Sequence, residues 1–261
     1  MKTLKFALMC IAALAMIACE PNNPNKPDND DTENNGTENN GGENNGGNSD
    51  DEDLVFNSLV SVTDGSIEDW NKLPKEYLAV AECAEEPYWE ALKSVKVYAD
   101  LVYINVLVEY DLTGINLDSV AFHLYFDTDL DASTGGYADQ WSDADTDVLL
   151  EGSLFQGGKP VDYVPSAHMW TGEVGGAGWY WEALAASGVF YASQWVGDNM
   201  LEIQLMRVMI PASWSREGFK VGFDIQENWE SVGVLPNLSL DENGTVQFAE
   251  KLLVTIDNNE Y

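Results

Sequence analysis

The sequence predicts an all-β fold, an antiparallel β-sandwich resembling a jelly roll, which follows a disordered N-terminal tether. The first observation is alternation: Leu201, Ile203 and Leu205 are separated by polar residues, the period-two pattern of a half-buried strand. The second is the weakness of helical periodicity beyond residue 54. Roughly ten strand-like segments with turn residues between them are typical of a sandwich.

The expected strands are rich in β-branched and aromatic residues. In chain order, the clearest are residues 101–110, 120–126, 201–205, 219–225 and 252–256. Only two short segments, near 87–92 and 211–214, are compatible with helical turns. We find no second linker after residue 54 long enough to separate domains, so 54–261 is expected to form one β-sandwich binding domain.

Residues 1–18 resemble a bacterial lipoprotein signal peptide. Lys2 and Lys5 precede an apolar run too short to span a bilayer as a helix. The run ends in Met16-Ile17-Ala18-Cys19, which is similar to a lipobox, and in that family the signal is cut before the cysteine and the thiol is acylated. Cys19 is therefore the candidate lipidation site. The alternative is an ordinary secretory signal with a chance cysteine at its end.

Residues 19–53 are expected to be a disordered, acidic, Asn/Gly-rich tether. They contain no aromatic residue and include three consecutive five-residue repeats between 32 and 46. Such a segment cannot bury enough apolar surface to offset the entropy of ordering it. Its length suits a spacer that holds a domain away from a membrane.

The charge of the chain excludes several classes of partner. It has 12 Lys+Arg and 45 Asp+Glu, a formal net charge of −33. Nucleic acids and anionic lipid surfaces both require a cationic face, so we expect no nucleic-acid partner and contact with the membrane through the lipid anchor only. Three cysteines are too few for a disulfide scaffold, and two histidines leave few candidates for a histidine-rich zinc site.

Three motifs, taken in order, carry a family resemblance. Asp64-Gly65 to Asp69-Trp70 opens the domain, Phe126-Asp127-Thr128-Asp129 follows a long strand, and Leu201 to Leu205 later leads into Ile210-Pro211. This order resembles the family 9 carbohydrate-binding modules and the wider DOMON-like β-sandwich superfamily. The resemblance implies a binding module rather than an enzyme. The superfamily also contains haem and redox domains, so it does not define the ligand.

The acidic loop after residue 126 is a candidate calcium site. Asp127, Asp129 and Asp131 alternate just beyond a strand, and Asp145 is a candidate fourth ligand. Calcium takes six to eight hard oxygen ligands, which such a turn directs to one point. The spacing departs from an EF-hand, so ligands from outside the loop would be needed, with Asp139, Asp143 and Asp147 as further candidates. The alternative is a solvated acidic loop.

Aromatic residues in the second half are candidate ligand contacts. They are Trp170, Trp179, Tyr180, Trp181 and Trp195. Flat aromatic rings stack on the apolar C–H faces of sugars at low entropic cost. On a strand, Trp179 and Trp181 would project from one face and Tyr180 from the other. A sandwich core also uses tryptophan, so core and ligand platform both remain open.

These features together predict a cell-surface lipoprotein that binds glycan without catalysis. We expect it in the outer membrane, lipid-anchored and facing the exterior, where it captures polysaccharide or oligosaccharide beside outer-membrane uptake proteins. The alternative is a structural or protein-interaction module of the cell envelope. Enzyme signatures are poor, because the sequence contains no nucleophile elbow or phosphate-binding loop. Acidic pairs suited to a glycosidase are uninformative in so acidic a chain.

Overall fold

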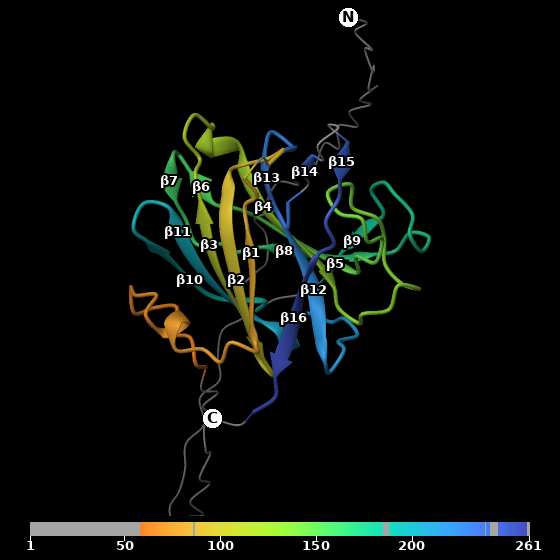
Figure 1. Ribbon diagram of the computed structural model, residues 1–261, viewed down its shortest axis with the longest axis horizontal. Helices are drawn as coiled ribbons and strands as arrows, with labels where there is room; N and C mark the ends of the chain where they lie inside the picture. Colours follow the sequence, from red (N-terminus) through yellow and green to blue (C-terminus); the bar gives the residue numbers. More distant parts are fainter. Residues whose placement is uncertain (1–57, 86, 185–187, 238, 241–244, 260–261) are drawn as a thin grey trace, which may run out of the picture. The chain divides into compact units, whose positions relative to one another are not determined.

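The computed structural model describes residues 58–261, apart from 86, 185–187, 238, 241–244 and 260–261 (Figure 1). The predictions for the signal peptide, Cys19 and the tether lie outside the described residues. Helical structure in the described part consists of three single turns, η1 (Asp69–Asn71), η2 (Leu117–Ser119) and η3 (Arg207–Met209). The helical turns expected near 87–92 and 211–214 do not form. No helix among these residues is long and apolar enough to cross a membrane.

The predicted all-β sandwich is confirmed. Its main sheet has 12 strands and curls so that its two halves face each other. One half contains β1 (Leu78–Glu82), β2 (Leu92–Asp100), β3 (Tyr103–Tyr110), β10 (Phe190–Val196) and β11 (Met200–Met206). The other contains β4 (Val120–Asp127), β5 (Val148–Ser153), β8 (Ser166–Trp170), β9 (Trp181–Ala183), β12 (Gly218–Glu227) and β13 (Glu230–Leu235).

The last strand joins the two halves. β16 (Leu252–Asp257) pairs antiparallel with β12 and parallel with β2, the one parallel pairing in the main sheet as described. The path therefore runs β10-β11-β3-β2-β16-β12-β4-β5-β8-β9. Two small hairpins lie outside it, β6 (Phe155–Gln156) with β7 (Lys159–Pro160) and β14 (Ser239–Leu240) with β15 (Val246–Gln247). All five predicted strands overlap strands of the structure.

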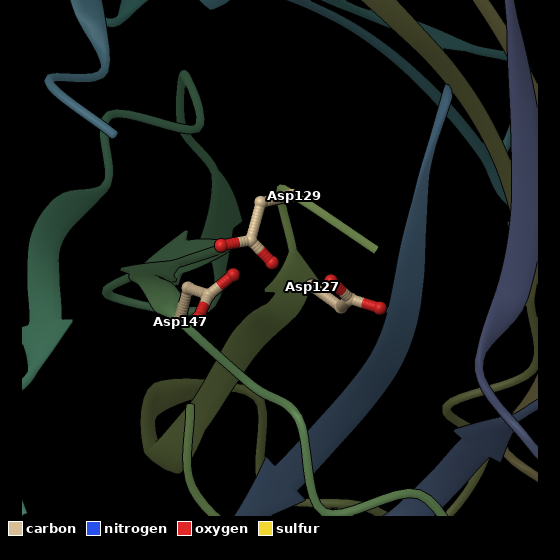
Figure 2. A group of neighbouring side chains, drawn as sticks. All are labelled: Asp127, Asp129 and Asp147. Atoms are coloured by element: carbon tan, nitrogen blue, oxygen red, sulfur yellow. The ribbon is translucent and has the colours of Figure 1, made fainter. Parts of the chain in front are cut away.

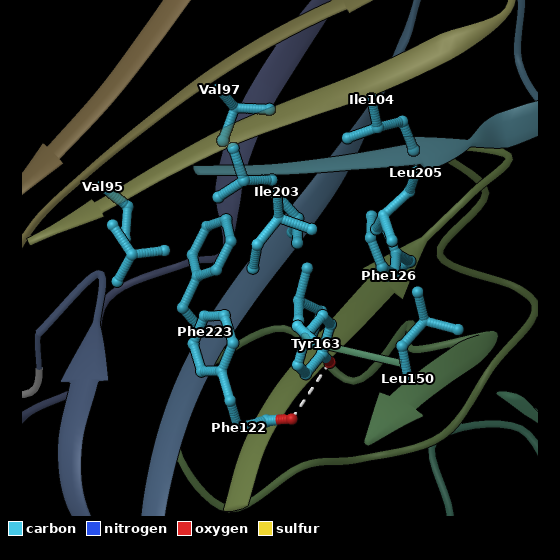
Figure 3. Packing of buried hydrophobic residues seen from close by; sticks show 14 of the residues in the cluster. Val95, Val97, Ile104, Phe122, Phe126, Leu150, Tyr163, Ile203, Leu205 and Phe223 are labelled. Atoms are coloured by element: carbon cyan, nitrogen blue, oxygen red, sulfur yellow. Dashed lines mark hydrogen bonds between the residues drawn. The ribbon is translucent and has the colours of Figure 1, made fainter. Parts of the chain in front are cut away.

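The core lies between the two halves of the curled sheet. Alternate side chains of both halves meet there, including Val97 and Ile203 from one half and Phe122 and Phe223 from the other (Figure 3). Tyr163, fully buried beside them, donates its hydroxyl to the Phe122 carbonyl at 3.0 Å. Each buried aromatic or aliphatic side chain of this kind contributes about 1.5–3 kcal/mol to folding.

The second half is also covered on its outer face. The loop between β4 and β5 crosses the sheet, and Trp141 from this loop is completely buried beside Ala138 and Val234. Gly222 on β12 provides the space, since an added Cβ would lie 2.4 Å from the Trp141 ring. β4 and β12 are therefore buried on both faces, which places polar side chains such as His123 and Asp224 out of solvent.

Candidate functional site

Four of the predicted ligand-contacting aromatics meet at the β8–β9 edge of the sheet. Trp170, the last residue of β8, lies directly opposite Trp181, the first residue of β9. The ring centroids of this pair are 5.2 Å apart with the planes at 69°, and Tyr180 meets the same Trp170 ring edge-on at 5.7 Å. We call Trp170, Trp179, Tyr180 and Trp181 the aromatic edge. Because β9 ends the strand path, this cluster lies at a margin of the sheet (Figure 1).

The aromatic edge has a buried base and an exposed tip. Trp170 is 9% exposed and its indole N–H donates to the Glu173 carbonyl at 3.1 Å. Trp179 and Tyr180, by contrast, are 65% and 57% exposed. The Tyr180 carbonyl accepts both the backbone N–H and the hydroxyl of Thr171, at 2.9 and 3.0 Å. The exposed rings are thus carried by a loop that is hydrogen-bonded across its base.

The strand geometry expected for residues 179–181 is not observed. β9 begins only at Trp181, so Trp179 and Tyr180 lie in the preceding loop and do not alternate across a strand. Gly172 allows the loop to pass close to the base, since an added Cβ would lie 2.4 Å from the Trp170 ring and 2.9 Å from Tyr180. The close loop path, rather than strand alternation, leaves both tip residues facing solvent.

Trp195 lies apart from the aromatic edge. It belongs to β10, at the opposite end of the strand path. Its ring meets Phe155 at 5.2 Å and Tyr110 at 5.8 Å, and its indole N–H donates to the Val161 carbonyl at 3.1 Å. The same three aromatic rings line a cavity of ≈ 480 Å³ with polar groups from Asp111 and Asn199. Trp195 is therefore a partly buried wall of a separate cavity.

Three carboxylates converge where β4 ends and β5 begins. Asp127 is the last residue of β4, Asp129 follows in the loop, and Asp147 precedes β5, held there by its N–H bond to the Phe126 carbonyl at 2.7 Å. One oxygen from each lies within 4.8 Å of the others. Figure 2 shows Asp129 and Asp147 facing each other with Asp127 beside them. We call these three residues the acidic cluster.

The donors around the acidic cluster leave one buried oxygen without a partner. Asp147 Oδ2 accepts the N–H and hydroxyl of Thr128 at 2.9 and 3.0 Å, and Asp129 Oδ1 accepts the hydroxyl of Thr134 at 3.1 Å. Asp127, fully buried, accepts the Leu130 N–H on Oδ1 at 2.8 Å, while its Oδ2 is buried and has no hydrogen-bond partner. An unpaired buried carboxylate oxygen is costly.

The electrostatics of the acidic cluster disfavour three negative charges. Burial, followed by the negative charge of Asp145, raises the pKa of Asp127 to about 7. The pKa of Asp147 is also raised, by burial first and by the charge of Asp129 to a smaller extent. Asp127 is therefore partly protonated near pH 7, and the cluster carries less than its full negative charge.

Two of the four predicted calcium ligands lie outside the acidic cluster. Asp131 is exposed and accepts the N–H and hydroxyl of Ser133, which lower its pKa. Asp145 is buried against Lys251 Nζ at 2.7 Å and Lys220 Nζ at 3.2 Å. Burial opposes the charge of Asp145, but hydrogen bonding and attraction to Lys251 hold its pKa below the usual value. Asp147, one of the outside candidates, joins Asp127 and Asp129 instead.

The acidic cluster and the aromatic edge are neighbours. Asp129, Asp147 and Trp170 line one cavity of ≈ 240 Å³. The backbone N–H of Trp170 donates to the Asp147 carbonyl at 2.8 Å. Gly136 packs against the Trp170 ring, since an added Cβ there would lie 2.4 Å from it. The two loops are also joined by backbone bonds from Gly175 to Gly135 and from Tyr137 to Gly176. The acidic loop is therefore the support of the aromatic edge.

A buried polar row on the outer face of the sheet extends toward the same edge. Glu151 lies between two histidines, with its oxygens 3.5 Å from His123 Nε2 and 3.2 Å from His168 Nε2. The His168 ring in turn lies 6.3 Å from Trp179. Burial, then His168, lowers the pKa of His123 to about 4, so this ring is neutral near pH 7. Asp224, opposite His123 in the register, accepts from Gln140, Gln226 and Ser231.

Sequence reasoning did not find this polar row. The strand pattern predicted an outer face open to solvent, where an isolated histidine or aspartate carries no signal. The proximity of Asp147 to Asp127 was easier to predict from the sequence. Antiparallel pairing of 120–126 with the strand after 147 brings these two residues together.

Comparison of the chain with protein-family models, characterised proteins and solved structures finds no match. The resemblance to family 9 carbohydrate-binding modules and DOMON-like domains accordingly stays a prediction. The class of protein that the structure defines is an all-β sandwich with the aromatic edge beside the acidic cluster.

Proposed function

We propose that this chain is a lipid-anchored protein that binds glycan without catalysis at the aromatic edge. The observation that carries the proposal is the combination of a buried Trp170 base with Trp179 and Tyr180 at 65% and 57% exposure. Exposing two adjacent large rings forgoes the burial that usually stabilises them. Rigid, exposed aromatic rings offer apolar stacking area with little loss of side-chain entropy.

Polar groups near the tip suit the hydroxyls of a sugar. His168 contacts Trp179, and its Nε2 lies 3.2 Å from a Glu151 carboxylate oxygen and 3.1 Å from the Ser166 hydroxyl. Carboxylates and imidazole nitrogens exchange hydrogen bonds with hydroxyl groups. A sugar ring stacked on Trp179 would therefore have both an apolar face and polar neighbours.

The proposal is tested by affinity electrophoresis and calorimetry of the mature chain against a panel of plant, algal and host polysaccharides. Trp179→Ala and Tyr180→Ala should each weaken binding about tenfold, since about 1.4 kcal/mol of lost stacking corresponds to that factor. Trp229→Ala is the matched control, because Trp229 is 78% exposed at the β12–β13 turn. Equal loss in all three variants, or a folded chain that binds no member of the panel, would refute the aromatic edge as a glycan site.

Membrane attachment through Cys19 is the second part of the proposal. Its support is the lipobox-like sequence and the low-complexity segment that follows. Two or three acyl chains anchor a protein stably, whereas one binds only marginally. Cys19→Ser should move the protein from the membrane fraction to the soluble fraction, and protease added to intact cells should digest the wild-type domain if it faces the exterior. An unchanged fractionation would remove the anchor from the account.

The rival is a structural or protein-interaction module of the cell envelope. It uses the same exposed rings, but for a protein partner such as an outer-membrane uptake protein. Ligand protection separates the two: an added oligosaccharide should shield Trp179 from acrylamide quenching only if the aromatic edge binds glycan. An enzyme would instead release reducing sugar from the panel, which a colorimetric assay detects.

A further inference from the structure

We propose that the acidic cluster of Asp127, Asp129 and Asp147 binds one calcium ion. The three carboxylates come from the end of β4, the loop after it and the residue before β5. Their ligand oxygens lie within 4.8 Å of one another. Calcium accepts mono- and bidentate carboxylates, carbonyls and water, so three converging carboxylates provide at least three of its usual six to eight ligands.

The unpaired oxygen of Asp127 is the second, independent observation. This side chain is completely buried, and its Oδ2 has no hydrogen-bond partner although its Oδ1 is satisfied by Leu130. Buried carboxylate oxygens are otherwise paired with donors or with metals. A cation within the acidic cluster would supply the missing partner.

The nearby lysines bind other carboxylates. Lys220 lies opposite Asp127 in the β4–β12 register, but its Nζ is 3.2 Å from Asp145 and 3.4 Å from Asp143. Lys251 Nζ likewise lies 2.7 Å from Asp145 and 3.1 Å from Asp143. Lys220 Nζ is also 3.9 Å from Glu250, so the two lysines form ion pairs with three other carboxylates, and Lys220 acts on Asp127 only as a more distant charge. Among the described residues no lysine forms an ion pair with the acidic cluster, which leaves its carboxylates for a cation from solution.

The chemistry of the cluster selects a hard cation. Its potential ligands are carboxylate oxygens with the hydroxyls of Thr128 and Thr134 close by. Oxygen-only sites of this kind favour calcium and magnesium over zinc or copper, which favour nitrogen and sulfur. Magnesium requires a tighter octahedral shell and keeps several waters, so a loop-built group of carboxylates fits calcium better.

The cation would also stiffen the aromatic edge. The Asp147 carbonyl holds the Trp170 N–H, and the loop at Gly135–Tyr137 is bonded to the loop at Gly175–Gly176. Calcium would therefore order the support on which Trp179 and Tyr180 are carried. This consequence rests on the proposed glycan function, whereas calcium binding itself does not.

Terbium luminescence of the full chain tests the cation site directly. Trp170 lines the same cavity as Asp129 and Asp147, so indole excitation should sensitise a bound terbium ion. We expect saturable emission that calcium displaces, in the wild type and in Asp131→Asn, whose carboxylate lies in the same loop but outside the acidic cluster. Asp127→Asn and Asp129→Asn should lose this emission. Equal emission from all four proteins would show ions bound loosely to an acidic surface and would overturn the proposal.

Thermal unfolding separates loss of the site from loss of the fold. Calcium should raise the Tm of the wild type and of Asp131→Asn by several degrees and leave Asp127→Asn unchanged. In chelator Asp127→Asn should melt at or above the wild-type temperature, because the substitution removes a repelled charge. A calcium response retained by Asp127→Asn would overturn the proposal. Calcium binding without glycan binding would refute the proposed function and leave the calcium site standing.

Discussion

Glu202 shows how one buried carboxyl group sets a pH dependence. It is fully buried on β11, where Oε1 accepts the Trp70 indole N–H at 2.6 Å and Oε2 has no partner. Burial raises its pKa to about 7, and the charges of Asp69 and Asp64 act in the same direction. The folded chain therefore keeps this proton over a pH range in which the unfolded chain has released it.

The sign of the pH effect follows from proton binding. Between the unfolded pKa of roughly 4.3 and the folded pKa of about 7, the folded state binds more protons, so this group's contribution to stability falls as pH rises through that window. Glu202→Gln is neutral and keeps an acceptor for Trp70. We expect the variant to match the wild type near the lower end of the window and to exceed its unfolding free energy by about 1–3 kcal/mol above it.

Urea unfolding over this pH range measures the difference. Glu182→Gln, which removes the same charge from an exposed position on β9, provides the control and should follow the wild-type profile. Parallel profiles for wild type and Glu202→Gln would contradict the expected titration.

The identity of the acidic residues predicted the chemistry of the loop but not which of its carboxylates lie together. Asp127 and Asp129 could be selected from spacing alone, because alternate residues after a strand project into one loop. Asp131 and Asp145 have the same side chain and similar spacing, but Ser133 satisfies one and two lysines pair with the other. Ser133 is only two residues from Asp131, but Lys220 and Lys251 are 75 and 106 positions from Asp145, and local patterns do not reveal such distant partners.

At the scale of elements, β16 is the strand that joins the two halves of the sandwich. Val254 and Ile256 on this strand are 0% and 1% exposed and belong to the core, while Leu253 between them is 58% exposed. The strand pairs with β12 on one side and β2 on the other. Loss of packing here should weaken both halves of the sandwich together.

Ile256→Ala is therefore expected to cost about 2–5 kcal/mol of unfolding free energy, the usual range for a truncated core aliphatic. Leu253→Ala, on the same strand but facing solvent, should change stability by no more than about 0.5 kcal/mol. Denaturant melts of both variants measure the two values. Similar losses in both would mean that the β16 side facing the core contributes no more than its outer side.

The strands themselves could be predicted, but their order could not. Alternation identified 201–205 and 219–225 because one face of each strand is apolar. β16 inserts between β2 and β12. Its pairing with β2 joins segments more than 150 residues apart along the chain, through only two paired positions. The start of β9 at Trp181 could not be predicted from the sequence either. Trp179 and Tyr180 have high β-propensity, yet they lie in a glycine-containing loop before the strand.

At the scale of the whole molecule, net charge selects among ligands. The chain carries −33 in total, and Glu173 and Glu182 are exposed near the aromatic edge. Like charges repel over the Debye length, roughly 30 Å at 0.01 M salt and roughly 8 Å at 0.15 M. An anionic polysaccharide would therefore meet an unfavourable potential before any ring could stack on Trp179.

We accordingly predict that neutral glycans bind better than uronate-rich or sulfated ones of similar linkage. The preference should be largest at low ionic strength and should shrink with added monovalent salt, because screening relieves repulsion without changing stacking. Calorimetry with a matched neutral and acidic oligosaccharide at two salt concentrations, with calcium held constant, measures both affinities. An acidic ligand that binds more tightly as salt is lowered would show that a local cation, and not the overall charge, dominates recognition. Reversal of that behaviour on chelation would then assign the attraction to calcium in the acidic cluster.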